Sequence, residues 1–118
     1  MNIGLCMGLA PGDEFRIERT ARKVSQFSHL PGEPSHDGTF DFARITQTLT
    51  RLGAPWRYSD DCGLYVCEST YWALLDHAHH YGFPIESGFL HVPAVDRSAP
   101  LDQTITTIRA IIADWLGR

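Results

Sequence analysis

Two short apolar runs constrain the fold of this chain most strongly, because almost every side chain in them is nonpolar. The first reads IGLCMGLA at residues 3 to 10 and stops at Pro11-Gly12, and the second reads SGFLHVPAV at residues 87 to 95. Runs of this length and composition are typical of strands that are buried on both faces of a sheet. We therefore predict two buried strands, the first of them close to Met1.

Three helices are predicted between and after these strands. Asp41 can cap a helix over residues 42 to 52, in which apolar residues recur at helical spacing before Gly53 ends it. A second helix, from about Gly63 to His80, is apolar over much of its girth, so we predict that it is covered on more than one side. The closing helix carries a single apolar stripe, formed by Leu101, Ile105, Ile108, Ile112 and Trp115.

The remaining segments fit between these elements. Residues 55 to 59, PWRYS, are a candidate strand, residues 15 to 24 suit helix or strand, and residues 25 to 38 read as a loop. The resulting alternation of strands and helices is typical of an α/β sandwich with parallel strands. At 118 residues the chain is long enough for one domain, residues 1–118, without a disulfide framework.

Composition and charge exclude several functional classes. The chain has 10 basic and 14 acidic residues, a net charge of −4 and no basic run, which argues against nucleic-acid binding. Every apolar run is far shorter than the ~20 residues that cross a bilayer, so no membrane span is predicted. The three cysteines are an odd number and no secretion leader is recognisable, so we predict a cytoplasmic protein with reduced thiols.

Cys62 and Cys67 raise the question of a metal site. Their five-residue spacing is wider than that of the usual zinc-binding pair, and no second pair of cysteines follows. In the histidine-rich segment after them, only Asp76 and His80 share a helix face, and histidines there suit the negative end of the helix dipole. The spacing therefore favours a solvated helix end, and no metal site is predicted.

Cys67 is also a candidate nucleophile. A thiol in the first turn of a helix lies near unpaired backbone N–H groups, which favour the thiolate. His91, near the C-terminal end of the second apolar strand, is the candidate base. The alternative is that both are packed core residues, since a buried cysteine behaves as a small hydrophobe. Four carboxylates remain open as the third member of such a triad: Glu18, Asp60, Asp61 and Glu68.

Three ordered motifs resemble the pyroglutamyl peptidase I family, the pyrrolidone-carboxylate peptidases. CGLYVCESTYWALL, which begins at Cys62, is similar to the family's Gly-x-aromatic-Val-Cys run around the nucleophile, with a Tyr four residues later. GFLHVP, residues 88 to 93, is similar to the segment around the family's catalytic histidine, and the 24-residue separation of Cys67 and His91 agrees with the family. CMGLAPGDEFRIERTA resembles a Gly-Gln-Ala-Gly-Gly segment followed by Glu-Arg-Val-Ala, and this places Glu18.

The resemblance implies a three-layer α/β/α sandwich with a mostly parallel sheet, and a cysteine peptidase that removes N-terminal pyroglutamate from peptides. Cys67 would attack the pyroglutamyl carbonyl, His91 would transfer the proton and Glu18 would orient His91. Cys62 replaces a small residue of the family and is not implied as a ligand.

The resemblance also implies how the substrate is held. Tyr65 and Val66 would line the lactam pocket, and the main chain at Leu9 would bond the ring. No metal or organic cofactor is implied. Bacterial members of the family commonly form homo-oligomers, so a homo-oligomer is expected.

The chain departs from the family pattern in three places. The family's first strand and its Phe-Glu-Pro-Phe-Gly-Gly loop, about the first third of the fold, have no counterpart. Ser28 stands about where the family has an Arg that stabilises the active site, and Arg22 is the candidate substitute. Glu68 replaces the usual Asn, and its negative charge beside Cys67 would raise the pKa of the thiol. Two hypotheses follow: an active, minimal peptidase of this type, or a non-catalytic remnant of the fold that acts in binding or assembly.

Overall fold

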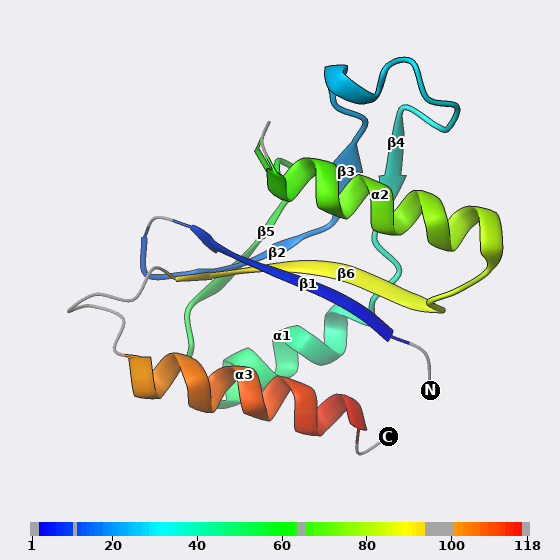
Figure 1. Ribbon diagram of the computed structural model, residues 1–118. Coiled ribbons are helices and arrows are strands. Elements are labelled where there is room, and N and C mark those ends of the chain that lie inside the picture. The colour runs from blue at the N-terminus through cyan, green and yellow to red at the C-terminus, as the bar shows by residue number, and fades with distance from the viewer. Residues whose placement is uncertain (1–2, 11, 64–65, 94–100, 117–118) are drawn as a thin grey trace.

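A computed structural model describes residues 3–10, 12–63, 66–93 and 101–116 as three layers, with helices on both faces of a sheet (Figure 1). Helix α2 covers one face, and helices α1 and α3 cover the other. The strands are β1 (Ile3–Ala10), β2 (Phe15–Glu18), β3 (Thr20–Arg22), β4 (Ser35–Asp37), β5 (Trp56–Ser59) and β6 (Glu86–Pro93). The helices are α1 (Phe42–Arg51), α2 (Val66–Tyr81) and α3 (Leu101–Leu116), with a short 3-10 turn at Ser25–Phe27. The predicted three-layer α/β class is confirmed.

Four of the described strands form the central sheet, in the order β1-β6-β2-β5. Strand β1 runs parallel to β6, and β2 runs parallel to β5. Strands β2 and β6 are antiparallel neighbours and join the two halves of the sheet. The sheet of the described residues is therefore mostly parallel, as predicted, with one antiparallel pair at its centre.

The two faces of the sheet differ in chemistry because successive side chains of a strand point to opposite faces. The face under α1 and α3 is apolar: Phe15, Ile17, Leu90 and Val92 pack there with Ile45, Leu49 and Ile111. Phe89 belongs to a second cluster that packs against α2 with Tyr71, Trp72, Leu75 and Cys62. The residues that alternate with the first set, among them Glu18 and His91, face this second cluster and are buried beneath α2.

Helix α1 begins where the sequence predicts. The Asp41 side chain accepts a hydrogen bond from the Arg44 main-chain N–H at 3.2 Å, which satisfies one of the free donors at the helix start. Gly53, with a φ of 69°, follows the last turn and allows the chain to leave the helix. Ile45 and Leu49 are buried on the inner side, which fixes the helix on the sheet.

Strand β1 is placed correctly by the sequence, but the prediction that it is buried on both faces is wrong. In the described part of the sheet, β1 is an edge strand with β6 as its one neighbour. Met7 is 44% exposed and Leu9 is 68% exposed. An apolar run alone does not distinguish an edge strand from a central one, because the neighbours of a strand come from elsewhere in the chain.

The predictions for α2 and α3 differ in outcome. Helix α2 is covered on more than one side, as predicted, by the central sheet and by strands β3 and β4, but its apolar residues Val66, 76% exposed, and Ala73 lie on a side that stays open. In α3 the buried residues are Thr104, Thr107 and Ile111, whereas most of the predicted stripe is not buried. Its members Leu101, Ile105 and Ile112 are exposed by 53%, 37% and 42%, and Ile108 is half-buried. The side chain of Trp115 lies outside the described residues.

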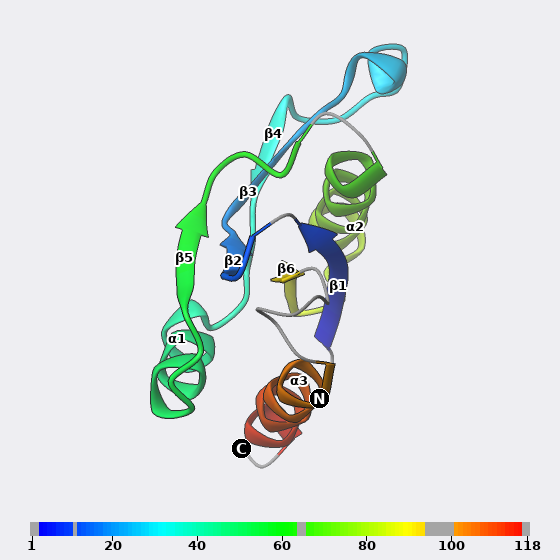
Figure 2. The ribbon, with the colours of Figure 1, turned by 90° about the vertical axis from the view of Figure 1, so that its left-hand side faces the viewer.

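The segment that the sequence left unassigned forms strand. Residues 15 to 24 contain β2 and β3, and β3 pairs with β4 in a separate antiparallel hairpin, in a region predicted to be a loop. Figure 2 shows this hairpin on the same side of the sheet as α2. Trp72 of α2 fixes the two together: its indole N–H donates to the Glu33 carbonyl at 3.0 Å, and its ring packs against Phe27.

Among the described residues, no helix is both long enough and apolar enough to cross a bilayer.

Candidate active site

Glu18 and His91 form a buried pair at the centre of the sheet. His91 Nδ1 lies 3.1 Å from Glu18 Oε1, and the two residues are 2% and 0% exposed. The antiparallel register of β2 and β6 places Arg16 opposite His91 and Glu18 opposite Phe89, so these side chains share one face. An ionised carboxylate only accepts hydrogen bonds, so Nδ1–H donates to Glu18 and Nε2 is the ring nitrogen left to take up a proton.

Cys67 lies in the first turn of α2, above this face. A Cβ atom built on Gly8 would lie 3.1 Å from Cys67 Sγ, so the glycine is what allows the sulfur to approach β1. Gly8 is the register partner of His91 on the neighbouring strand, and adjacent strands are about 4.8 Å apart. The thiol therefore sits one strand away from the imidazole, and no hydrogen bond between described residues joins His91 to Cys67.

The electrostatics around Cys67 favour the protonated thiol. Burial and the Glu18 carboxylate raise its pKa above the usual value, while the Arg16 guanidinium and a backbone N–H at the helix start act in the opposite direction. At neutral pH the sulfur therefore carries its proton, and a base is needed to remove it. The position of Cys67 in the first turn of a helix favours a thiolate, but burial and the Glu18 charge outweigh this effect.

Glu68 does not act as the sequence predicts. Its carboxylate is fully buried and accepts hydrogen bonds from the Arg22 main-chain N–H at 2.5 Å and from Arg22 Nε at 3.3 Å. The charge that raises the pKa of Cys67 belongs to Glu18, whereas Glu68 acts on Cys62. The prediction failed because sequence adjacency does not determine which way a side chain turns on a helix.

The positive charge of the site comes from Arg16 and not from Arg22. Arg16 Nε lies 3.9 Å from Glu18 Oε1 and is buried without a hydrogen-bond partner. Arg22 is held by Glu68 and by Asp61, whose Oδ1 lies 2.9 Å from Arg22 Nη2. Arg16 is not among the predicted site residues, although its position two residues before Glu18 on a strand puts both side chains on one face.

The other candidate carboxylates lie elsewhere. Asp60 forms an exposed ion pair with Arg19 at 2.9 Å, and Asp61 pairs with Arg22. Of the four carboxylates that the sequence left open, Glu18 is the one that contacts His91. Within the histidine-rich segment, His80 Nδ1 lies 3.6 Å from Asp76 Oδ2, and no group of three metal-ligating side chains was found there among the described residues.

The residues predicted to contact substrate are only partly described. Tyr65 lies outside the described residues. Val66, at the start of α2, has an exposed side chain. The Leu9 side chain is exposed as well, and because β1 is an edge strand of the described sheet, one side of its main chain is open to a ligand.

Comparison with known proteins shows the family of the chain. A family model described as Pyroglutamyl peptidase matches residues 19–111. The chain belongs to the pyroglutamyl peptidase family. The match includes Cys67 and His91 and begins one residue after Glu18, so the place of Glu18 in the site rests on its contact with His91.

Curated relatives in this family are longer than the chain. It is 31% identical over 109 residues to the pyrrolidone-carboxylate peptidase of Pyrococcus furiosus, covering 80% of this chain and 52% of the relative. It is 29% identical over 89 residues to that of Vibrio vulnificus, covering 74% of this chain and 41% of the relative. The chain thus spans about half the length of the curated relatives it matches.

Solved structures of the family share the fold. The pyrrolidone carboxyl peptidase of Fervidobacterium islandicum superposes with a TM-score of 0.84 at 19% identity, covering 99% of this chain and 70% of that one. A mutant pyrrolidone carboxyl peptidase from Pyrococcus furiosus gives a TM-score of 0.82 at 23% identity, with 98% and 69% covered. The chain therefore shares its fold with these structures and corresponds to about 70% of their length.

Proposed function

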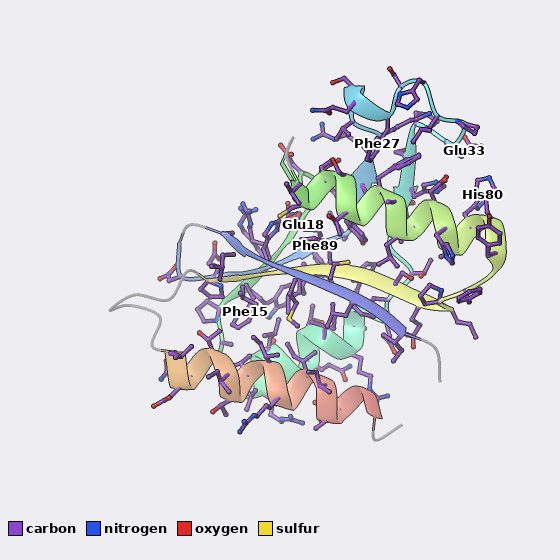
Figure 3. All side chains as sticks on the ribbon, viewed as in Figure 1. Phe15, Glu18, Phe27, Glu33, His80 and Phe89 are labelled. Atoms are coloured by element: carbon purple, nitrogen blue, oxygen red, sulfur yellow. The ribbon has the colours of Figure 1, made fainter. Side chains whose placement is uncertain are left out.

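We propose that this chain is a cysteine peptidase that removes N-terminal pyroglutamate from peptides, with Cys67, His91 and Glu18 as its catalytic triad. The observation that carries the proposal is the buried contact of 3.1 Å between His91 Nδ1 and Glu18 Oε1, on the sheet face below Cys67 (Figure 3, where Glu18 is labelled between the sheet and α2). A carboxylate held this way fixes the imidazole tautomer and stabilises its protonated form. Family membership supports the substrate class.

The proposed reaction begins with the neutral thiol. His91 Nε2 removes the Cys67 proton as the sulfur attacks the carbonyl carbon between pyroglutamate and the next residue. The imidazolium then gives this proton to the leaving amine, and a thioester remains on Cys67. Water, deprotonated by His91, hydrolyses the thioester and releases pyroglutamate. The Glu18 carboxylate accepts the hydrogen bond from Nδ1–H and balances the charge on the ring.

The surroundings of Cys67 supply the remaining interactions. Backbone N–H groups in the first turn of α2 are not bonded within the helix and point toward its N-terminus, where Cys67 lies. They can hold the oxyanion of the tetrahedral intermediate. Tyr65 and Val66 would line the lactam pocket, and the main chain of Leu9 at the sheet edge would bond the lactam ring. These substrate contacts are part of the proposal and rest on the family resemblance.

We place the protein in the cytoplasm as a homo-oligomer. Cys6, Cys62 and Cys67 are free thiols, which suits a reducing compartment. Helix α3 exposes Leu101, Ile105 and Ile112, apolar side chains of the kind that subunit interfaces cover. Size-exclusion chromatography with light scattering tests the assembly by comparing the molar mass of the wild type with that of Ile105→Glu. The wild type should elute as an oligomer and the variant as a smaller species.

The activity is tested by release of a fluorophore from a pyroglutamyl amide. The wild type should show turnover that iodoacetamide abolishes, and Cys67→Ser and His91→Gln should each lose nearly all of it. A prolyl amide, which has the ring but lacks the lactam carbonyl, serves as the matched substrate control and should not be cleaved.

Absence of Cys67-dependent turnover in a folded wild-type protein would refute the peptidase proposal. That result would favour the alternative, a non-catalytic member of the family that acts in binding or assembly. Folding is checked independently by circular dichroism and by a cooperative urea transition.

A further inference from the structure

Cys62 occupies a position that the proposed peptidase mechanism does not use. It lies between β5 and α2, is 4% exposed, and packs in the cluster beneath α2. Its sulfur, a carboxylate oxygen of Glu18 and a ring nitrogen of His91 all lie within 4.8 Å of one another. All three residues are buried, so the sulfur lies in the protein interior beside the pair that we place in the triad.

We propose that Glu18, Cys62 and His91 form a binding site for a zinc ion. Thiolate, imidazole and carboxylate are the three ligand types that Zn²⁺ takes in proteins. At usual zinc–ligand distances, tetrahedral ligand atoms lie about 3.5 Å apart. The three ligand atoms, which lie within 4.8 Å of one another, would therefore have to approach by about an ångström at their widest pair when the ion binds.

An unpartnered oxygen points to a missing ligand at this place. Glu18 Oε2 is buried and forms no hydrogen bond, although its residue is 0% exposed. A buried carboxylate oxygen without a partner costs about 1–3 kcal/mol or more, since it has lost its contacts with water. A cation bound to this carboxylate would satisfy the oxygen without rearrangement of the main chain.

The charges around Cys62 also suit a cation. Burial, and then the carboxylates of Glu18 and Glu68, raise the pKa of the Cys62 thiol. Arg16 is a positive group near it and only partly offsets these two carboxylates. Zinc binds cysteine as the thiolate, so binding of the ion would release the proton of the Cys62 thiol.

Zinc binding and peptidase chemistry would exclude each other. The ion would occupy the carboxylate and the imidazole that the peptidase needs for proton transfer, so zinc would act as an inhibitor that removal of the metal reverses. This consequence rests on the proposed function, but the zinc site itself does not. Cys62 stands where the family has a small residue, so the site would distinguish this chain from relatives without the cysteine.

Direct binding measurements test the site without any need for turnover. Zinc affinity is determined by competition with a chromophoric chelator, and Co²⁺ is added separately to look for thiolate-to-cobalt charge-transfer absorption. The wild type should bind one ion per chain and show this absorption. Cys62→Ser should lose the absorption and bind zinc at least about 10-fold more weakly. Cys6→Ser, which removes a thiol that is not one of the three proposed ligands, should behave as the wild type.

Equal zinc affinity of the wild type and Cys62→Ser would overturn the proposal, as would loss of binding in Cys6→Ser alone. If Cys62→Ser does not fold, X-ray absorption at the zinc edge of the zinc-loaded wild type decides between the outcomes. A coordination shell with one sulfur and with nitrogen and oxygen neighbours supports the site, and a shell without sulfur refutes it. A protein that binds zinc through Cys62 but cleaves no pyroglutamyl amide would refute the proposed function and leave the zinc site intact.

Discussion

Replacing Glu18 with Gln tests the buried pair with the smallest change of shape. The hydrogen bond from His91 Nδ1 to Glu18 Oε1 is 3.1 Å long and shielded from water, since Glu18 is 0% exposed. Hydrogen bonds to charged groups contribute about 1.5–3 kcal/mol. If that contribution is made in the transition state, where the imidazole is charged, its loss lowers kcat/KM by roughly 10- to 150-fold, at 1.36 kcal/mol for each factor of ten.

The assay is hydrolysis of a pyroglutamyl amide by Glu18→Gln over a range of substrate concentrations. Glu14→Gln is the matched control, because Glu14 forms an exposed ion pair with Arg57 and should leave kcat/KM unchanged. A loss carried mainly by kcat identifies a transition-state role. A change of less than threefold in a folded Glu18→Gln protein, with turnover still dependent on Cys67, would contradict the assignment of Glu18 to the triad.

Three further predictions follow from single contacts. The rate of Cys67 alkylation by iodoacetamide should keep rising from pH 7 to beyond pH 9, because burial and the Glu18 carboxylate raise the pKa of the thiol and only the thiolate reacts; a plateau below pH 8 contradicts this. Tyr71→Phe removes the hydrogen bond from the buried hydroxyl to the Glu18 carbonyl at 2.8 Å, so the free energy of unfolding in urea should fall by about 1–2 kcal/mol, whereas the exposed Tyr81→Phe should not change it. Gly8→Ala places a methyl group 3.1 Å from Cys67 Sγ and 3.2 Å from the Phe89 ring, so kcat/KM should drop while the urea transition remains cooperative; unchanged kinetics would show that the close approach of the sulfur to β1 is not needed.

Local patterns identified most elements of the fold. Asp41, the apolar residues after it and Gly53 lie within one short stretch, so capping and periodicity located α1 correctly. The apolar runs located β1 and β6 for the same reason. The segment at residues 15 to 24 resisted assignment because its strands are short, and β3 pairs with β4 rather than with the central sheet.

The candidate site was only partly predictable. The motifs singled out Cys67 and His91, and resemblance alone selected Glu18 among four carboxylates. Arg16 was missed because it looks like an exposed ion-pair partner until β2 is paired with β6. The resemblance implies that Cys62 replaces a small residue of the family and is not a ligand. Its sulfur comes close to Glu18 and His91 only in the folded chain.

The sequence by itself determined the family, the class of fold and the residue types available for chemistry, because motifs and periodicity are local properties of a chain. Only the tertiary structure decided that β1 lies at the edge of the described sheet, that α3 buries Thr104, Thr107 and Ile111, and which charges surround the thiols. Strand order, register and helix rotation depend on contacts between residues far apart in the chain. Local sequence patterns do not specify those contacts.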